Sequence, residues 1–272
     1  IKMNEENSAG IFVQNESKVT NNGIINMLEI GSAGVYVENS DVENAKNSKI
    51  MIGNGDSAGI YGKYSDSKNH TMVNNGDILV SSSQLSNNQS IGMYSELENT
   101  AQGTLEVVNN KNIDIDMQNS LGIFAKNNAS DKEKIRVINN DTIKIRKNKS
   151  VGVFSDNTVV ENNKNINIEG EESTGIFGKN GAEVKNKSNG IITLQDTSGN
   201  DSKSSGIYVD GANSKGVNEG SIVLNGKAIT GMSATNGASS LNSLSILGNK
   251  DTAVGMYGNT STVENGTNGV IT

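Results

Sequence analysis

Residues 8–13 read SAGIFV, and close variants of these six letters recur along the whole chain. In each of ten copies a Gly is followed by Ile, Val or Met, and nine copies place Phe or Tyr next. Successive glycines are 23 to 33 residues apart. A repeat of this length indicates a solenoid, a propeller or an array of small units. The ten glycines are Gly10, Gly34, Gly59, Gly92, Gly122, Gly152, Gly175, Gly206, Gly231 and Gly255.

Two further patterns fill the residues between copies. One is a pair of apolar residues at positions i and i+2, such as Ile25 with Met27. The other is a Val two residues before an Asn. Alternation of this kind predicts strands and not helices. The Val and Asn pattern is assigned to Val19/Asn21, Val42/Asn44, Val73/Asn75, Val108/Asn110, Val160/Asn162 and Val184/Asn186.

Three short strands per repeat, separated by Asn, Gly and Asp, are typical of one triangular coil of a parallel β-helix. Leucine-rich repeats need Leu at fixed offsets and a helical half, and propeller blades need about 40 residues and four strands. We therefore predict an all-β solenoid, a parallel β-helix of about ten coils with three strands each, that occupies residues 1–272 as one unit. With strands about 4.8 Å apart, the rod is roughly 48 Å long.

Stacking explains the repeated letters, because equivalent residues of successive coils lie on top of one another. The residue after the Gly is apolar in every copy, so we expect it to form an interior column. Stacked Asn side chains form hydrogen-bonded ladders and tolerate the backbone of tight turns. The interior column comprises Ile11, Val35, Ile60, Met93, Ile123, Val153, Ile176, Ile207, Met232 and Met256.

The aromatic residue of each copy forms a second column. Strand alternation places these rings on the face opposite the interior column and on the same side as the Gly. Two interpretations remain open at this point: a structural ladder at a corner of the coil, or a partly exposed stripe that contacts a partner. The column comprises Phe12, Tyr36, Tyr61, Tyr94, Phe124, Phe154, Phe177, Tyr208 and Tyr257, and Ser233 interrupts it.

Composition excludes several classes of function. The chain has no Cys, so it has neither disulfides nor thiolate zinc sites. Its net charge of -7 argues against nucleic acid as a partner, because phosphate binding needs a surplus of Lys and Arg. No apolar run is long enough to span a membrane and no signal peptide opens the chain. We expect an interior segment of a longer protein.

Some repeats are longer than 25 residues, and the excess falls in five polar stretches. Such insertions leave the stacked core of a solenoid intact and often carry its function, although drift in exposed turns is the alternative. Most of them lie between the third and fifth coils. The five stretches are residues 62–72, 81–90, 95–106, 126–134 and 195–205.

Aromatic and cationic residues in or beside these stretches are the candidates for receptor binding, through stacking and charge pairing. His70 is the only histidine, so it cannot form a His-rich metal site, and we expect it to be a solvated loop residue. The binding candidates are Tyr64, His70, Tyr94, Lys132, Lys134 and Arg136.

Asp114 and Asp116 share the outward face of one strand, which could suggest an acid and base pair. Counting back from the next Gly favours another interpretation, in which Asp116, Arg146 and Glu169 stack as alternating charges. Each such cross-strand pair contributes roughly 0.2 to 1 kcal/mol. Nucleotide-binding, zinc protease and calcium-roll motifs are not found. We therefore expect no catalytic residues, no cofactor and no metal.

The repeats SAGIFV, SAGVYV, SAGIYG, SIGMYS, SLGIFA, SVGVFS and STGIFG, each followed by stretches such as VTNNGII, VNNGDI or VENNKNINI, resemble a known family. They are similar to the passenger regions of large fusobacterial type V autotransporter adhesins, the RadD-like outer-membrane proteins and their Gal-GalNAc lectin relatives. The resemblance covers all ten coils. It implies a right-handed β-helix that is exported through an outer-membrane barrel, absent from this segment, and displayed on the cell surface.

The expected function is therefore attachment to a receptor, glycan or protein, on other bacteria or on host cells, through loops on the rod or through the aromatic stripe. The alternative is a passive spacer that presents a distal binding tip. A carbohydrate-active enzyme is a third and weaker alternative, because enzymatic β-helices cluster Asp, Lys or Arg on one sheet and the charges here are scattered.

Overall fold

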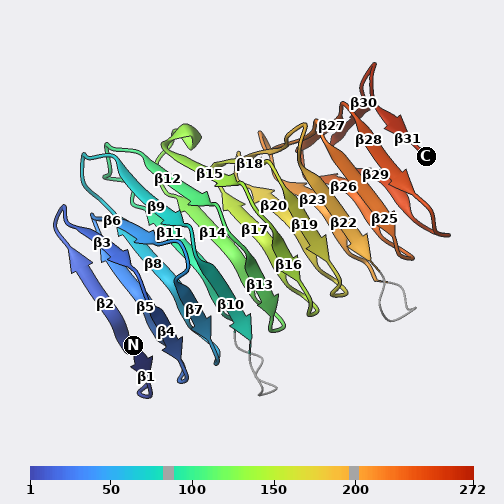
Figure 1. Cartoon of the computed structure of the whole chain (residues 1–272). Coiled ribbons are helices and arrows are strands. Elements are labelled where there is room, and N and C mark those ends of the chain that lie inside the picture. Colours follow the sequence, from blue (N-terminus) through green and yellow to red (C-terminus); the bar gives the residue numbers. More distant parts are fainter. Residues whose placement is uncertain (82–88, 196–201) are drawn as a thin grey trace.

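The computed structural model describes residues 1–81, 89–195 and 202–272. In these residues the chain passes repeatedly through three parallel sheets, A, B and C, and each coil adds one strand to each sheet (Figure 1). The three sheets contain 11, 10 and 10 described strands. The predicted parallel β-helix of about ten coils with three strands per coil is confirmed.

The strands are short and follow the repeat. Sheet A is formed by β1 (Lys2–Met3), β4 (Ile24–Met27), β7 (Lys49–Ile52), β10 (Asp77–Ser81), β13 (Ile113–Asp116), β16 (Ile143–Ile145), β19 (Asn165–Ile168), β22 (Ile191–Gln195), β25 (Ser221–Asn225), β28 (Ser245–Gly248) and β31 (Val270–Ile271). Sheet B is formed by β2 (Ala9–Gln14), β5 (Ala33–Glu38), β8 (Ala58–Tyr64), β11 (Ile91–Leu97), β14 (Leu121–Asn127), β17 (Val151–Asp156), β20 (Thr174–Lys179), β23 (Ser205–Asp210), β26 (Thr230–Thr235) and β29 (Val254–Asn259).

Sheet C is formed by β3 (Lys18–Asn21), β6 (Asp41–Asn44), β9 (His70–Asn74), β12 (Leu105–Asn109), β15 (Ile135–Asn139), β18 (Val159–Asn162), β21 (Glu183–Asn186), β24 (Lys215–Asn218), β27 (Ser239–Asn242) and β30 (Thr262–Asn265). A 3-10 turn, η1 (Lys132–Lys134), precedes β15. No helix in the described parts of the chain is long and apolar enough to cross a membrane. Coils are numbered below by their sheet B strand, from coil 1 (β2) to coil 10 (β29).

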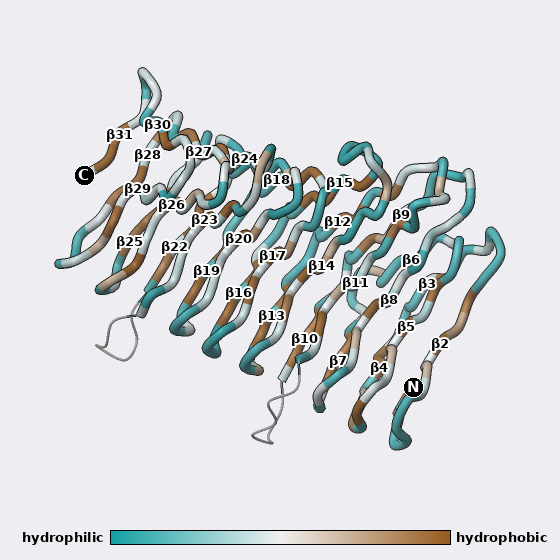
Figure 2. Tube along the Cα trace, turned by 180° about the vertical axis from the view of Figure 1, so that it is seen from behind, coloured by the Kyte–Doolittle hydropathy of each residue, from teal (hydrophilic) through white to brown (hydrophobic). Residues whose placement is uncertain are grey.

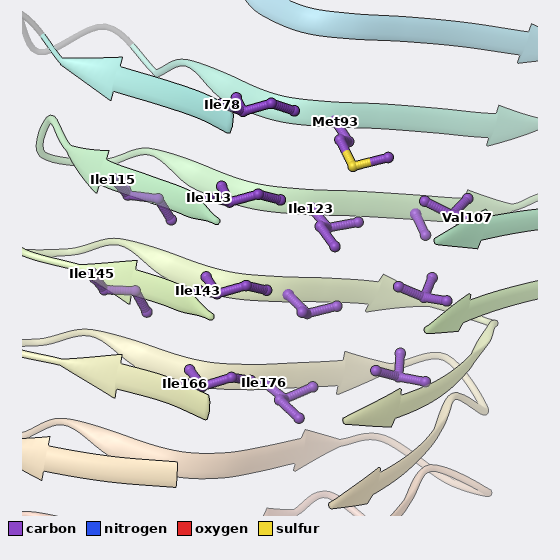
Figure 3. Close-up of a cluster of buried hydrophobic side chains, with 14 of the residues drawn as sticks. Ile78, Met93, Val107, Ile113, Ile115, Ile123, Ile143, Ile145, Ile166 and Ile176 are labelled. Atoms are coloured by element: carbon purple, nitrogen blue, oxygen red, sulfur yellow. The ribbon is translucent and has the colours of Figure 1, made fainter. Parts of the chain in front are cut away.

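The core is a set of apolar columns that run along the rod, so hydrophobic residues recur at the same height on each strand (Figure 2). On sheet A, Ile78, Ile113, Ile143 and Ile166 are aligned in register and fully buried (Figure 3). The residue after each repeat Gly forms the matching column on sheet B, where Ile123 pairs with Met93 and Val153. These positions are those that the alternating pattern predicts.

The repeat Gly lies where the chain turns from sheet A into sheet B, and it faces the interior. A Cβ on Gly122 would lie 2.6 Å from the carbonyl oxygen of Gly152 and 3.2 to 3.3 Å from Ile115 and Ile143. The expectation that the Gly shares a face with the aromatic ring is therefore wrong. Because the strand bends at the Gly, strict alternation begins only at the residue that follows it.

A continuous Asn ladder occupies the corner between sheets C and A. Each amide nitrogen donates to the next side-chain oxygen, as from Asn109 to Asn139 at 2.8 Å. In coils 3 and 4 the predicted positions Asn75 and Asn110 are wrong by one residue, because the interior ladder uses Asn74 and Asn109. The ladder comprises Asn21, Asn44, Asn74, Asn109, Asn139, Asn162, Asn186, Asn218, Asn242 and Asn265.

The displaced asparagines form a second, outer ladder. Asn110 donates to Asn75 at 2.9 Å, and Asn140 donates to Asn110 at 2.9 Å. Two adjacent asparagines therefore both stack, one inside the coil and one outside. The letters alone do not distinguish them, which is the physical reason for the error in register.

The Ser that begins each of the first eight copies of the repeat forms a ladder of its own. At the corner between sheets A and B the backbone N–H of each Ser donates to the hydroxyl of the Ser one coil later, as from Ser120 to Ser150 at 3.2 Å. This satisfies a buried donor that the turn would otherwise leave without a partner. The ladder comprises Ser8, Ser32, Ser57, Ser90, Ser120, Ser150, Ser173 and Ser204.

Candidate functional site

The outer face of sheet B carries three parallel columns of side chains. Relative to the repeat Gly, the outward residues are the one before it, the second after it and the fourth after it, because alternation continues from the buried residue after the Gly. In coil 3 these residues are Ala58, Tyr61 and Lys63, and the cross-strand register carries each position into the next coil. We call the three sets the flanking column, the ring column and the charge ladder.

The ring column is a nearly continuous stack. Centroids of neighbouring rings from Phe12 to Tyr208 are 4.5 to 5.2 Å apart. Tyr61 and Tyr94 are parallel within 1°, whereas Phe154 meets Phe177 edge to face. Such pairs contribute about 0.5 to 1.5 kcal/mol each beyond their buried area. Each ring is in the middle of a sheet B strand, so the column runs along the rod on the face of the sheet and not at a corner.

The same rings remain partly exposed to solvent. Phe12 and Tyr257 in the end coils are 55% and 49% exposed, and the rings between them are half-buried. Both interpretations of the aromatic column thus describe part of it: the rings pack against one another as a structural ladder and also remain partly exposed. The result is an unusually long aromatic stripe on one side of the rod.

A groove lies beside the stripe in coils 1 to 4, with a volume of about 520 Å³. Tyr36, Tyr61 and Tyr94 form one wall, and the flanking column and the turns from sheet A form the remainder. The other lining residues are Asn7, Ser8, Ala9, Gly31, Ser32, Ala33, Asp56, Ser57, Ala58, Gln89 and Ile91. The groove combines flat apolar surface with hydroxyl and amide groups, which suits a polar ligand that also has an apolar face.

The ring column is joined to the charge ladder through Glu96. The hydroxyl of Tyr94 donates to Glu96 at 2.8 Å, and Lys126 and Asn128 each donate to the other carboxylate oxygen at 3.0 Å. Burial opposes the ionised form of Glu96, but these hydrogen bonds outweigh it and leave the pKa of Glu96 below its ordinary value. Burial, with the bond to Glu96, raises the pKa of Tyr94, so its phenol keeps its proton.

The charge ladder alternates in sign over seven coils. Cross-strand pairing places each lysine between two acidic residues, as Lys63 lies between Glu38 and Glu96. Lys126 lies between Glu96 and Asp156, and Lys179 lies 3.4 Å from Asp156. The ladder comprises Glu38, Lys63, Glu96, Lys126, Asp156, Lys179 and Asp210. Sequence reasoning missed it, although every member follows its Gly by four residues.

Two of the sequence-based binding candidates are buried, so they offer no contact surface. Tyr64 ends β8 with 1% of its surface exposed, and its ring lies tilted against that of His70 with the centroids 5.1 Å apart. His70 begins β9 and is 6% exposed, with its Nε2 3.0 Å from Asp66. The expectation that His70 is a solvated loop residue is wrong, because the strands in coil 3 extend into the predicted loop.

The cationic candidates already have partners within the rod, and only Arg136 is exposed, whereas Lys132 and Lys134 are half-buried. Lys132 lies 2.9 Å from Glu183, and Arg136 lies 2.8 Å from Glu161. Lys134 donates to the carbonyl oxygen of Ala101 at 2.6 Å. Of the six candidates, only Tyr94 lies on the outer face of sheet B.

The predicted insertions fall at two corners. Residues 82–88 and 196–201, within the predicted insertions 81–90 and 195–205, lie outside the described residues. The other three link sheet B to sheet C and are bound to the rod: Leu97, Leu105 and Ala129 join the hydrophobic core. The backbone N–H of Gln102 donates to Asp66 of the previous coil at 2.9 Å. Stretches 62–72, 95–106 and 126–134 therefore enlarge the rod at this corner.

On the outer face of sheet A the predicted columns are right, but the predicted ion pairs within a column are wrong. The register places Asp114 opposite Lys144 and Ile115 opposite Ile145, so Asp116 and Arg146 occupy the same predicted column. The ion pairs, however, are diagonal: Arg146 forms two bonds of 2.7 Å with Asp114, and Lys144 lies 2.7 Å from Glu169. The long guanidinium reaches the more buried carboxylate, which gains more from a charged partner than exposed Asp116 does.

Among the described residues no group of three or more His, Cys, Asp and Glu side chains could hold a metal ion. A scan of protein-family models, a search of curated proteins and a search of solved structures each found no match to the chain.

Proposed function

We propose that this chain is a segment of a surface-displayed adhesin that attaches to other bacteria or to host cells, and that its contact surface is the outer face of sheet B. The observation that carries the proposal is the ring column, which leaves a long aromatic stripe partly exposed on a rigid sheet. Exposed apolar surface of this extent marks interaction sites, and aromatic residues are enriched at the centres of interfaces.

The stripe is favoured over the insertions as the contact surface. Tyr64 and His70 are buried, and Lys132, Lys134 and Arg136 already have partners within the rod. Display at the outer membrane is part of the proposal, and its support is the resemblance of the repeats to fusobacterial passenger regions.

A passive spacer is the second candidate, and a specific feature favours it. The Asn ladder links all ten coils, as from Asn139 to Asn162 at 2.7 Å, so the rod resists bending and could hold a distal tip away from a membrane. The two candidates differ in their prediction for isolated coils. An adhesin segment binds cells by itself, whereas a spacer does not.

The test is attachment of the purified, fluorescently labelled chain to partner bacteria and host cells. The test variant combines Phe124→Ser with Phe154→Ser, because Ser233 shows that the ring column accepts serine. The matched control combines Leu79→Ser with Val223→Ser on the outer face of sheet A, where both side chains are half-buried. We expect saturable binding that the ring variant loses and the control keeps. Equal binding by both variants contradicts the proposed surface, and no binding by the wild-type chain favours the spacer.

A further inference from the structure

We propose that the partner of the sheet B face is a second copy of the same chain, packed face to face with its rod axis antiparallel to the first. This inference rests on the proposed function, since it identifies the receptor for that face. Three features carry it: the spacing of the charge ladder, the order of the three columns and the area of the face.

The charge ladder restricts the partner. Its sign changes with every coil, so each charge lies one strand spacing, about 4.8 Å, from the opposite charge. A surface complements this pattern only if its own charges alternate with the same period along the same axis. Another β-helix with this ladder meets that requirement. The ladder carries four acidic residues and three lysines, so it is nearly neutral although the whole chain carries -7.

The order of the columns selects the antiparallel arrangement. A two-fold axis that lies in the interface and crosses the rod keeps each column at its own position along the strands. The flanking column then faces the flanking column, the ring column faces the ring column, and the ladder faces the ladder. A two-fold axis along the rod places the ladder over the flanking column instead, where the apolar Leu121 and Val151 offer Lys126 and Asp156 no charged group on the other copy.

The register that centres the two-fold axis between coils 5 and 6 pairs coil 3 with coil 8, coil 4 with coil 7, and coil 5 with coil 6. In this register every lysine of the ladder meets an acidic residue. Lys63 faces Asp210, Lys179 faces Glu96, and Lys126 faces Asp156. Since the two-fold axis repeats each contact, six complementary charge contacts form.

The ring column is compatible with the same register. Phe124 of one copy meets Phe154 of the other, and Tyr61 meets Tyr208. The face measures roughly 48 Å along the rod and roughly 20 Å along the strands, or about 960 Å². A stable interface needs about 800 Å² from each partner. Rods that project from two opposing cells meet antiparallel, so this contact joins cells that display the same protein.

A charge exchange between two copies tests the inference. Lys63→Glu alone places two acidic residues opposite each other at two points of the dimer, and Asp210→Lys alone does the same with two lysines. Mixed together, the two variants restore opposite charges at both points. We expect the wild-type chain to self-associate in sedimentation experiments, each single variant to associate about tenfold more weakly, and the mixture to recover the wild-type affinity.

Folding is checked by circular dichroism and melting temperature, because Lys63→Glu places three acidic residues in successive coils of its own ladder. Phe154→Ser, which alters the central ring contact and leaves the ladder unchanged, is a second test that must also weaken association. A wild-type chain that stays monomeric at about 0.1 mM overturns the inference. So does association that both single variants retain, or a mixture that recovers nothing.

The failure of this inference is distinguishable from that of the proposed function. A monomeric chain that still binds cells lacking the protein, and loses binding on ring substitution, supports the sheet B face with a different receptor, such as a glycan in the groove of coils 1 to 4. A chain that neither self-associates nor binds cells contradicts both.

Discussion

The ammonium of Lys126 on β14 lies 3.0 Å from a carboxylate oxygen of Glu96 on β11, one coil earlier. The pair joins two columns of sheet B, because the other oxygen of Glu96 accepts a hydrogen bond from Tyr94. The hydrogen bond from Lys126 to Glu96 raises the pKa of Lys126. The charge ladder and the ring column are therefore one connected surface, because Glu96 binds both Lys126 of the ladder and Tyr94 of the column.

Lys126→Met removes the cation and leaves the buried carboxylate of Glu96 without it. We expect the pKa of Glu96 to rise, because burial then meets less opposition, and the free energy of unfolding at neutral pH to fall by about 1 kcal/mol. Carbon-13 NMR titration of the carboxyl group and urea unfolding measure the two effects. Lys147→Met, which alters a lysine 56% exposed and 3.5 Å from Asp116, is the matched control and should change the unfolding energy little. An unchanged pKa of Glu96 contradicts the role of Lys126.

Glu183 makes stability depend on pH. Hydrogen bonds from Lys132 and Lys185 lower its pKa from 4.5 to about 2. A carboxylate whose pKa is lowered by folding stabilises the fold above its unfolded value, and this contribution is lost as the pH falls from 4.5 toward 2. Glu183→Gln should cost about 1 to 2 kcal/mol at pH 7 and nothing near pH 2.

The measurement is urea unfolding of wild-type and Glu183→Gln chains between pH 2 and pH 7. The control is Glu264→Gln, which alters an exposed carboxylate of coil 10. A gap between wild type and Glu183→Gln that stays constant over the whole range argues against the ion pairs as its cause.

The repeat Gly is required by the close approach of successive coils. Gly122→Ala places a Cβ 2.6 Å from the carbonyl oxygen of Gly152, which is backbone and cannot rotate away. We expect a loss of about 2 to 3 kcal/mol in the free energy of unfolding. Gly23→Ala is the matched control, since nothing lies within 4 Å of its new Cβ, and it should change stability by less than about 0.5 kcal/mol. Similar losses in both variants refute the close-approach explanation.

The two Asn ladders differ in burial, and adjacent residues test the difference. Asn139 is fully buried and donates to Asn162, whereas neighbouring Asn140 is exposed. Asn139→Asp loses the donor and places a carboxylate against an amide oxygen, so we expect a loss of about 3 kcal/mol or more at neutral pH. Asn140→Asp should cost less than about 1 kcal/mol. Thermal unfolding of both variants decides, and equal effects contradict the assignment of an inner and an outer ladder.

The fold was predictable because every coil repeats the same constraint. Ile113 and Ile115 alternate inward with no exception nearby, and ten copies of the Gly motif set the period. The register in coils 3 and 4 was harder to predict, because Asn74 and Asn75 both form ladders and differ only in the side of the coil they occupy. The burial of His70 could not be predicted from the polar residues around it, because this burial depends on the longer strands of coils 3 and 4.

The candidate site was partly predictable. The ring column was visible in the letters, but whether Tyr94 faces solvent depends on the bend at the preceding Gly, which shifts the start of alternation. The charge ladder was readable at a fixed offset from each Gly, as Lys126 follows Gly122, once the copies are aligned. The loop candidates were chosen by residue type, which does not reveal a partner within the rod. Lys132 and Arg136 both form ion pairs there.

Hydroxyl-radical footprinting of the chain, free and bound to partner cells, tests the central claim most directly. Tyr61 and Phe124 report on the ring column, and residues 98–104 report on the insertions. We predict that binding protects Tyr61 and Phe124 from oxidation and leaves the insertions unchanged. Protection of the insertions with an unprotected ring column would contradict the assignment of the sheet B face as the contact surface.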